Sequence, residues 1–206
     1  MGLRDRKRSG RAMSTHFNKV LASDISKQQI ENAFQAANIE YTVCSAEQTP
    51  FEDQSFNLIT VGQALHWFDL DAFYAEAKRT LKEDGLLAVW GYANLSISDE
   101  IDKHFLHFYN NVVGPYWDEA RRLVEDEYRN IHFPFKEIST PNFSIEVDWN
   151  VDQLAGYLTS WSATQKFIKA NQYNPVGNFM IVLKPLWKKD EVKRVKFPVF
   201  LRLGKV

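Results

Sequence analysis

The chain has 206 residues, of which 45% are apolar, and this is enough for one globular domain with a substantial core. The formal net charge is −1 at pH 7, so the composition gives no electrostatic reason to bind nucleic acid or an anionic membrane. Cys44 is the only cysteine, which excludes a disulfide within the chain and favours a cytoplasmic location. No apolar run approaches the roughly 20 residues that cross a bilayer.

The N-terminus differs in composition from the rest of the chain. Residues 4–8 are charged in succession, and such a run cannot form a buried strand because each charge would lose its hydration. We therefore predict that residues 1–13 are a basic, disordered tail and that the folded domain covers residues 14–206. No apolar stretch follows the basic residues, so the tail is not a signal peptide.

From residue 20 onward the apolar pattern is regular. Short apolar or alternating runs predict strands, and apolar residues at helical spacing predict helices. The expected strands are 20–22, 39–43, 56–61, 86–90, 143–149 and 195–203, and the expected helices are 26–37, 70–81, 101–112, 117–128 and one that begins near 154. Ser26 and Gln29 fit a capping box for the first helix, and Gly85 is a natural stop for the second. Unbroken apolar strands between helices indicate an α/β fold with a sheet covered on both faces, and residues 96–135 are predicted to be a helical insertion.

Asp24 follows the first of these strands and precedes a helix. A carboxylate in that place can accept hydrogen bonds from both ribose hydroxyls of a nucleoside, as it does in dinucleotide enzymes. The other interpretation is a carboxylate that is stabilised by the dipole at the start of a helix. Asp24 by itself does not decide between the two.

Residues 44–68, CSAEQTPFEDQSFNLITVGQALHWF, are the most specific stretch of the chain. A polar-Ala-Glu step at 45–47 and a Pro-Phe turn at 50–51 precede a strand that is entered through Phe56-Asn57. In this order the segment resembles the class I S-adenosylmethionine (SAM)-dependent methyltransferases of the methyltransferase type 11 kind. The sequence Gln-Ala-Leu-His-Trp at 63–67 is similar to that of a subgroup that includes trans-aconitate methyltransferase-like proteins.

The resemblance implies a class I methyltransferase sheet of Rossmann-like type that ends in an antiparallel C-terminal strand. It also implies SAM as the cofactor and a small-molecule acceptor, without nucleic acid or membrane partners. The site residues that it implies are Gly10, Asp24, Ser45, Ala46 and Gln63 for the cofactor, His66 for catalysis, and Trp67 and Tyr92 for the substrate. The family usually has Asp where Ser45 stands and often where Asn57 stands, so both polar contacts are altered.

The family's first strand and its glycine-rich loop are missing or altered in this sequence. That loop cradles the methionine part of SAM, and close backbone approach there requires glycine. Gly10 matches the last glycine of the loop, but residues 3–8 are mostly charged and do not match a central apolar strand. We therefore expect an N-terminally truncated or altered member of the family.

Three functions remain open on the sequence alone. The first is SAM-dependent methyl transfer, with no metal site and with Arg121 and Arg122 as candidates to hold a carboxylate acceptor. The alternative is a non-catalytic or truncated remnant that no longer binds SAM well. A nicotinamide-dependent dehydrogenase fits Asp24 equally well, but the chain has no Gly-x-Gly-x-x-Gly and the dehydrogenase does not account for residues 44–68.

Overall fold

The computed structural model describes residues 11–206. These residues form two compact units. We call one the sheet unit, which holds the chain up to residue 89 together with 133–139 and 202–206, and the other the helical unit, which holds 90–132 and 140–201. The helical unit is thus larger than the predicted insertion at 96–135. The predicted tail ends at residue 13, inside a helix that runs over residues 11–16.

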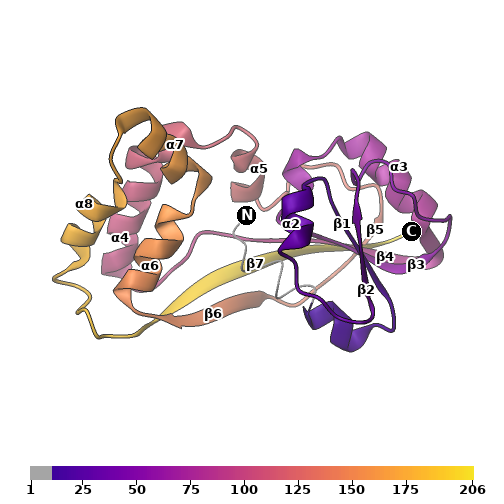
Figure 1. Cartoon of the computed structure of the whole chain (residues 1–206), viewed down its shortest axis with the longest axis horizontal. Helices are drawn as coiled ribbons and strands as arrows, with labels where there is room; N and C mark the ends of the chain where they lie inside the picture. The colour runs from indigo at the N-terminus through magenta and orange to yellow at the C-terminus, as the bar shows by residue number, and fades with distance from the viewer. Residues whose placement is uncertain (1–10) are drawn as a thin grey trace. The chain divides into compact units, whose positions relative to one another are not determined.

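The sheet unit begins with two parallel strands, β1 (Val20–Asp24) and β2 (Ile39–Val43), which are labelled in Figure 1. The helix between them, α2 (Lys27–Glu31), is much shorter than the predicted 26–37. The predicted capping box does not form, since the Ser26 side chain makes no capping bond. The helix ends early because Asn32 turns its side-chain amide onto the Gln28 carbonyl at 2.8 Å.

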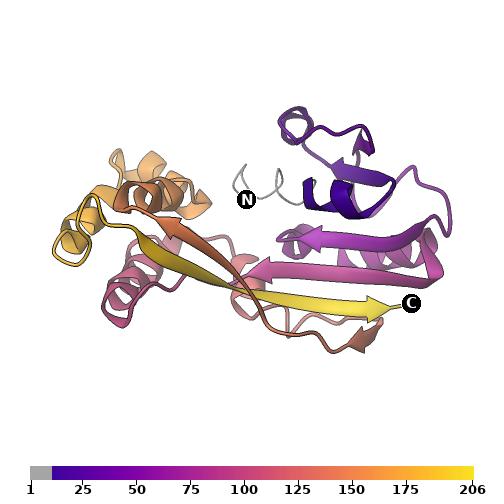
Figure 2. The same cartoon turned by 90° about the horizontal axis from the view of Figure 1, so that it is seen from below.

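The remaining strands form a second sheet in the order β3-β4-β7-β5, with β6 also paired to β7. Their bounds are β3 Phe56–Gly62, β4 Leu81–Tyr92, β5 Lys136–Ile138, β6 Phe143–Trp149 and β7 Lys193–Lys205. Figure 2 shows β3 and β4 pointing the same way and β7 the opposite way, and β5 and β6 both pair antiparallel with β7. The predicted mixed α/β fold and antiparallel C-terminal strand are therefore confirmed. Among residues 11–206, no strand pairing joins β1 and β2 to this sheet.

The prediction of a missing first strand concerns residues 3–9 and Gly10, which lie outside the described residues, so it stays a prediction. The prediction for Gly85 is wrong. The second predicted helix ends at Thr80, and Gly85 lies inside β4. Glycine is needed there because a Cβ atom would lie 2.9 Å from both the Leu81 side chain and the Lys82 carbonyl oxygen.

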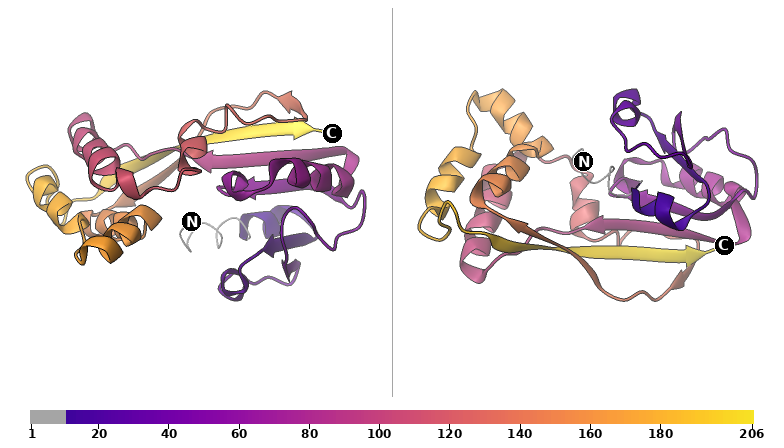
Figure 3. Two further views of the ribbon diagram at one scale, coloured as in Figure 1. Left: turned by 90° about the horizontal axis from the view of Figure 1, so that it is seen from above. Right: turned by 60° about the horizontal axis from the view of Figure 1, so that its bottom comes forward.

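Helix α3 (Leu70–Thr80) runs alongside β3 and β4 in Figure 3. Asp69 caps its start by accepting the Ala72 N–H at 3.2 Å. Phe73, Tyr74 and Ala77 are buried on the face that the apolar spacing predicted.

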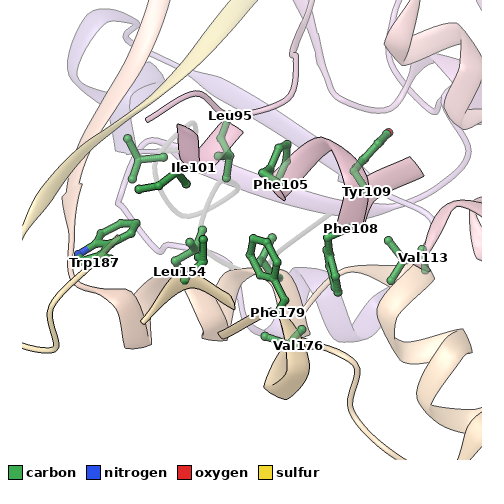
Figure 4. Close-up of a cluster of buried hydrophobic side chains, with 14 of the residues drawn as sticks. Leu95, Ile101, Phe105, Phe108, Tyr109, Val113, Leu154, Val176, Phe179 and Trp187 are labelled. Atoms are coloured by element: carbon green, nitrogen blue, oxygen red, sulfur yellow. The ribbon is translucent and has the colours of Figure 1, made fainter. Parts of the chain in front are cut away.

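The helical unit packs around one apolar core, part of which is drawn in Figure 4. Its elements are α4 (Asp99–His107), the π-helix η2 (Phe108–Val112), a 3₁₀ turn (Gly114–Tyr116), α5 (Arg121–Glu125), α6 (Val151–Thr159), α7 (Ser162–Asn171) and α8 (Val176–Leu183). The helix predicted over 117–128 is reduced to α5. Trp117 has extended backbone, and Glu127 and Tyr128 adopt left-handed backbone with φ of 53° and 57°.

Candidate functional site

Asp24 is the last residue of β1, as expected for a nucleoside-binding carboxylate. Its register partner is Val43, the last residue of β2, so residues 44–46 leave the sheet beside it. The carboxylate is half-buried and accepts the Ser26 N–H at 2.8 Å. Asp24 therefore fixes the entry to α2 and stands at the carboxyl edge of parallel strands, and its role in binding a nucleoside stays a prediction.

Ser45 and Ala46 are half-buried at the same edge. The Ser45 hydroxyl donates to the Glu47 carboxylate, and the Glu47 N–H donates back to that hydroxyl at 3.2 Å. Glu47 also accepts the Asp69 N–H at 3.1 Å, which ties this loop to the start of α3. The sequence marked Glu47 as part of the family step but gave no sign of this structural role, because its partner lies 22 residues away.

Gln63, His66 and Trp67 follow β3. Gln63 is only 6% exposed and adopts left-handed backbone with φ of 52°. A buried polar residue in that conformation is unusual outside functional sites. His66 lies next to Trp67 in a 3₁₀ turn (Leu65–Trp67), with their ring centroids 4.7 Å apart. Trp67 is 61% exposed, so its ring is accessible for a contact with another molecule.

The other two predicted residues are Tyr92 and Gly10. Tyr92 ends β4 in the helical unit, where its ring packs edge-on against Phe197 at 5.8 Å. Trp67 belongs to the sheet unit, so the predicted pairing of these two residues at a substrate stays a prediction. Gly10 lies outside the described residues. Within residues 11–206, no group of three or more His, Cys, Asp or Glu side chains is arranged to hold a metal ion.

A hydrogen-bonded network that the sequence did not predict holds the 45–53 loop on α3. Glu76 accepts both the backbone N–H and the hydroxyl of Thr49, at 2.8 and 2.5 Å. Arg79 donates to both Glu76 oxygens, at 2.8 and 2.7 Å, and to Asp53 at 2.5 Å. The Arg79 bonds lower the pKa of Glu76 to about 2, despite the opposing effect of burial.

Arg79→Gln is expected to lower the free energy of unfolding at pH 7 by about 2 kcal/mol, because it leaves the Glu76 carboxylate only partly bonded. The lowered pKa of Glu76 stabilises the fold fully above the ordinary value of 4.5, and this contribution is lost as the pH falls from 4.5 towards 2. Urea unfolding at several pH values should therefore show a shallower acid loss of stability in the variant. The matched control is Arg129→Gln, since the pair of Arg129 with Glu127 is exposed and should contribute less than about 1 kcal/mol. Equal stability of both variants at pH 7 would contradict the prediction.

Comparison with known proteins identifies the family. A family model described as a methyltransferase domain matches residues 8–89. A Dictyostelium discoideum protein assigned as a methyltransferase is 34% identical over 200 residues, which cover 94% of this chain and 76% of that protein. The chain belongs to the class I SAM-dependent methyltransferase family.

Solved structures of other methyltransferases agree with this assignment. The structure of an Anaeromyxobacter dehalogenans protein assigned as a type II methyltransferase has a TM-score of 0.90 and 29% identity, and the match covers 97% of this chain and 86% of that one. A methyltransferase structure from Bacillus halodurans shares the fold at 18% identity and a TM-score of 0.51 over 97% of this chain and 88% of that one. No helix within residues 11–206 of this methyltransferase is long and apolar enough to cross a membrane.

Proposed function

We propose that this methyltransferase transfers the methyl group of SAM to a small-molecule acceptor, and that the acceptor presents a carboxylate. The observation that carries the SAM site is the end of the β1–β2 sheet. Asp24 and Val43 are register partners there, so the ribose-binding candidate Asp24 lies beside the Ser45-Ala46 step. Parallel strands bring their carboxyl ends, and the loops that bind ligands, to one edge.

The residues at this edge fit the nucleoside end of SAM. Asp24 would accept the ribose hydroxyls, and Ser45 and Ala46 would lie along the adenine edge. Gln63 would contact the methionine part of SAM. Its burial and its left-handed backbone suit this role, because they hold the side chain in one place. SAM supplies an activated methyl group on a sulfonium, so the protein has to align the acceptor and exclude water.

The acceptor class determines what His66 must do. A carboxylate is already ionised at pH 7 and needs no general base, whereas a hydroxyl or amine acceptor would use His66 to remove a proton. In this proposal Trp67 contacts the acceptor. Likeness to the trans-aconitate methyltransferase subgroup, which rests on residues 63–67, supports the carboxylate class.

Asp24→Asn is expected to weaken SAM binding by about tenfold or more, because a charge-assisted hydrogen bond to a hydroxyl contributes roughly 1.5–3 kcal/mol. The asparagine oxygen can still accept the Ser26 N–H, so α2 should keep its start. Isothermal titration calorimetry of the full chain with SAM measures the effect.

The matched control is Asp71→Asn, an exposed position in the first turn of α3, which should bind SAM like the wild type. Equal binding by Asp24→Asn and wild type would overturn the assignment of Asp24 to the ribose. Absence of SAM binding by the wild-type chain would overturn the proposed function and favour the remnant.

A further inference from the structure

The helical unit has a surface hollow of about 390 Å³ that the proposed SAM site does not use. This volume is within the range of pockets that hold small organic ligands. The residues of its lining on which the argument rests are Tyr109, Trp117, Asp118, Arg121 and Glu125.

One wall of the hollow is aromatic and comes from an irregular helix. Tyr109 belongs to the π-helix, in which the Val113 N–H donates to the Phe108 carbonyl at 3.1 Å. Such helices occur frequently at functional sites. Figure 4 shows the Tyr109 hydroxyl directed away from the other labelled side chains of the core. The ring of Trp117 lies 5.2 Å from that of Tyr109, so two aromatic rings stand side by side in the lining.

Arg121 is one of two arginines in the lining, the other being Arg122. The Arg121 guanidinium lies 5.0 Å from the centre of the Trp117 ring, and its Nε–H donates to the Tyr109 hydroxyl oxygen at 3.1 Å. Among residues 11–206, its terminal N–H groups meet no carboxylate within ion-pair distance and no hydrogen-bond acceptor. An arginine that is held by stacking, with its terminal donors available, is arranged for bidentate binding of an anion.

Two of the three acidic residues of the lining are already engaged, and the third, Glu119, is exposed. Asp118 pairs with Lys166 at 2.5 Å. Glu125 accepts the Tyr109 hydroxyl, and burial raises the pKa of Tyr109 to about 12. The indole N–H of Trp117 is a buried donor without a partner within the described residues. This N–H therefore serves as a reporter of binding at the Trp117 ring.

We propose that this hollow binds a small aromatic carboxylate, with the carboxylate on Arg121 and the aromatic ring against Tyr109 and Trp117. This binding requires neither SAM nor methyl transfer, so it stands independently of the proposed function.

The test uses benzoate as the probe and the full chain without SAM. The nuclear magnetic resonance spectrum of the Trp117→Phe variant lacks one indole N–H signal of the wild type. That missing signal identifies the Trp117 resonance. We expect benzoate to shift this resonance in the wild type, while benzamide and benzylamine, which lack the carboxylate, do not. Arg121→Gln should weaken benzoate binding by about tenfold or more, and Arg129→Gln, an exposed arginine outside the lining, should leave it unchanged.

Two results would overturn the proposal. One is a Trp117 resonance that benzoate leaves unmoved, or that benzamide shifts equally. The other is an Arg121→Gln variant, shown to be folded by circular dichroism, that binds benzoate as tightly as the wild type. The comparison of the three probes on the wild-type chain holds even if the variant does not fold. If the chain does not bind SAM but binds benzoate as described, this inference still holds.

Discussion

Gly204→Ala is expected to destabilise the sheet unit by about 3 kcal/mol and to lower its melting temperature by roughly 10 °C. Gly204 lies in β7 opposite Glu137 of β5. A Cβ atom on it would lie 2.5 Å from the Phe135 Cβ and 2.6 Å from the Phe133 ring. Real Cβ atoms do not approach so closely. The Phe135 Cβ is fixed to the backbone, so the strand itself would have to move.

The aromatic residues under Gly204 cannot give way easily. Phe133 and Phe135 pack on each other and on the buried ring of Tyr74, at centroid distances of 5.3, 6.1 and 5.8 Å. The Arg202 guanidinium covers the Phe133 ring at 4.6 Å. A shift of one ring therefore disturbs several contacts at once, because packed interiors have little free volume.

The same substitution should have the opposite sign at Gly156 in α6. A Cβ atom there meets nothing within 4 Å, and alanine favours a helix interior over glycine by about 0.5–1 kcal/mol. Thermal unfolding followed by circular dichroism compares the two variants. If Gly204→Ala were as stable as the wild type, the close packing of β7 on Phe133 and Phe135 would be refuted.

The elements that the sequence predicted well have apolar residues at regular spacing. Strand β2 and helix α3 show such periodicity over their whole length, and their observed bounds lie close to the predicted ones. Strand β7 also appears where the alternation of Val195 to Leu203 predicted it. Burial of one face decides these elements, so the local pattern is sufficient.

The elements that the sequence did not predict depend on particular backbone or side-chain choices. Helix α2 ends early at Asn32, and α5 is limited by left-handed backbone at Glu127 and Tyr128. Neither feature changes the apolar spacing. Gly85 has the appearance of a helix stop, but close packing inside β4 is what requires a glycine there.

Only the part of the candidate site that depends on strand order could be predicted from the sequence. Parallel pairing of β1 with β2 brings Asp24 next to the residues before Ser45, and the order of elements is enough to infer this. The anchoring of the loop was not predictable, because Thr49 and Glu76 are 27 residues apart. The hollow beside Arg121 depends on a π-helix, and no sequence pattern marked one at Phe108–Val112.

Trp187→Ala is expected to lower the free energy of unfolding of the helical unit by about 3–5 kcal/mol. Trp187 is only 2% exposed and belongs to the core of this unit. Its indole N–H donates to the Glu191 carbonyl at 2.9 Å, and the Lys193 ammonium lies 5.9 Å from its ring centre. Alanine would therefore leave a large cavity and an unpaired carbonyl together.

Two further variants separate these contributions to stability. Trp187→Phe keeps most of the apolar volume but removes the N–H, so it should cost less than the alanine variant, about 1–2 kcal/mol. Trp67→Ala removes a tryptophan that is 61% exposed and should change stability by less than about 0.5 kcal/mol. Urea unfolding followed by far-ultraviolet circular dichroism avoids the loss of tryptophan fluorescence in these variants. Similar destabilisation by Trp187→Ala and Trp67→Ala would mean that Trp187 is not part of a tightly packed core.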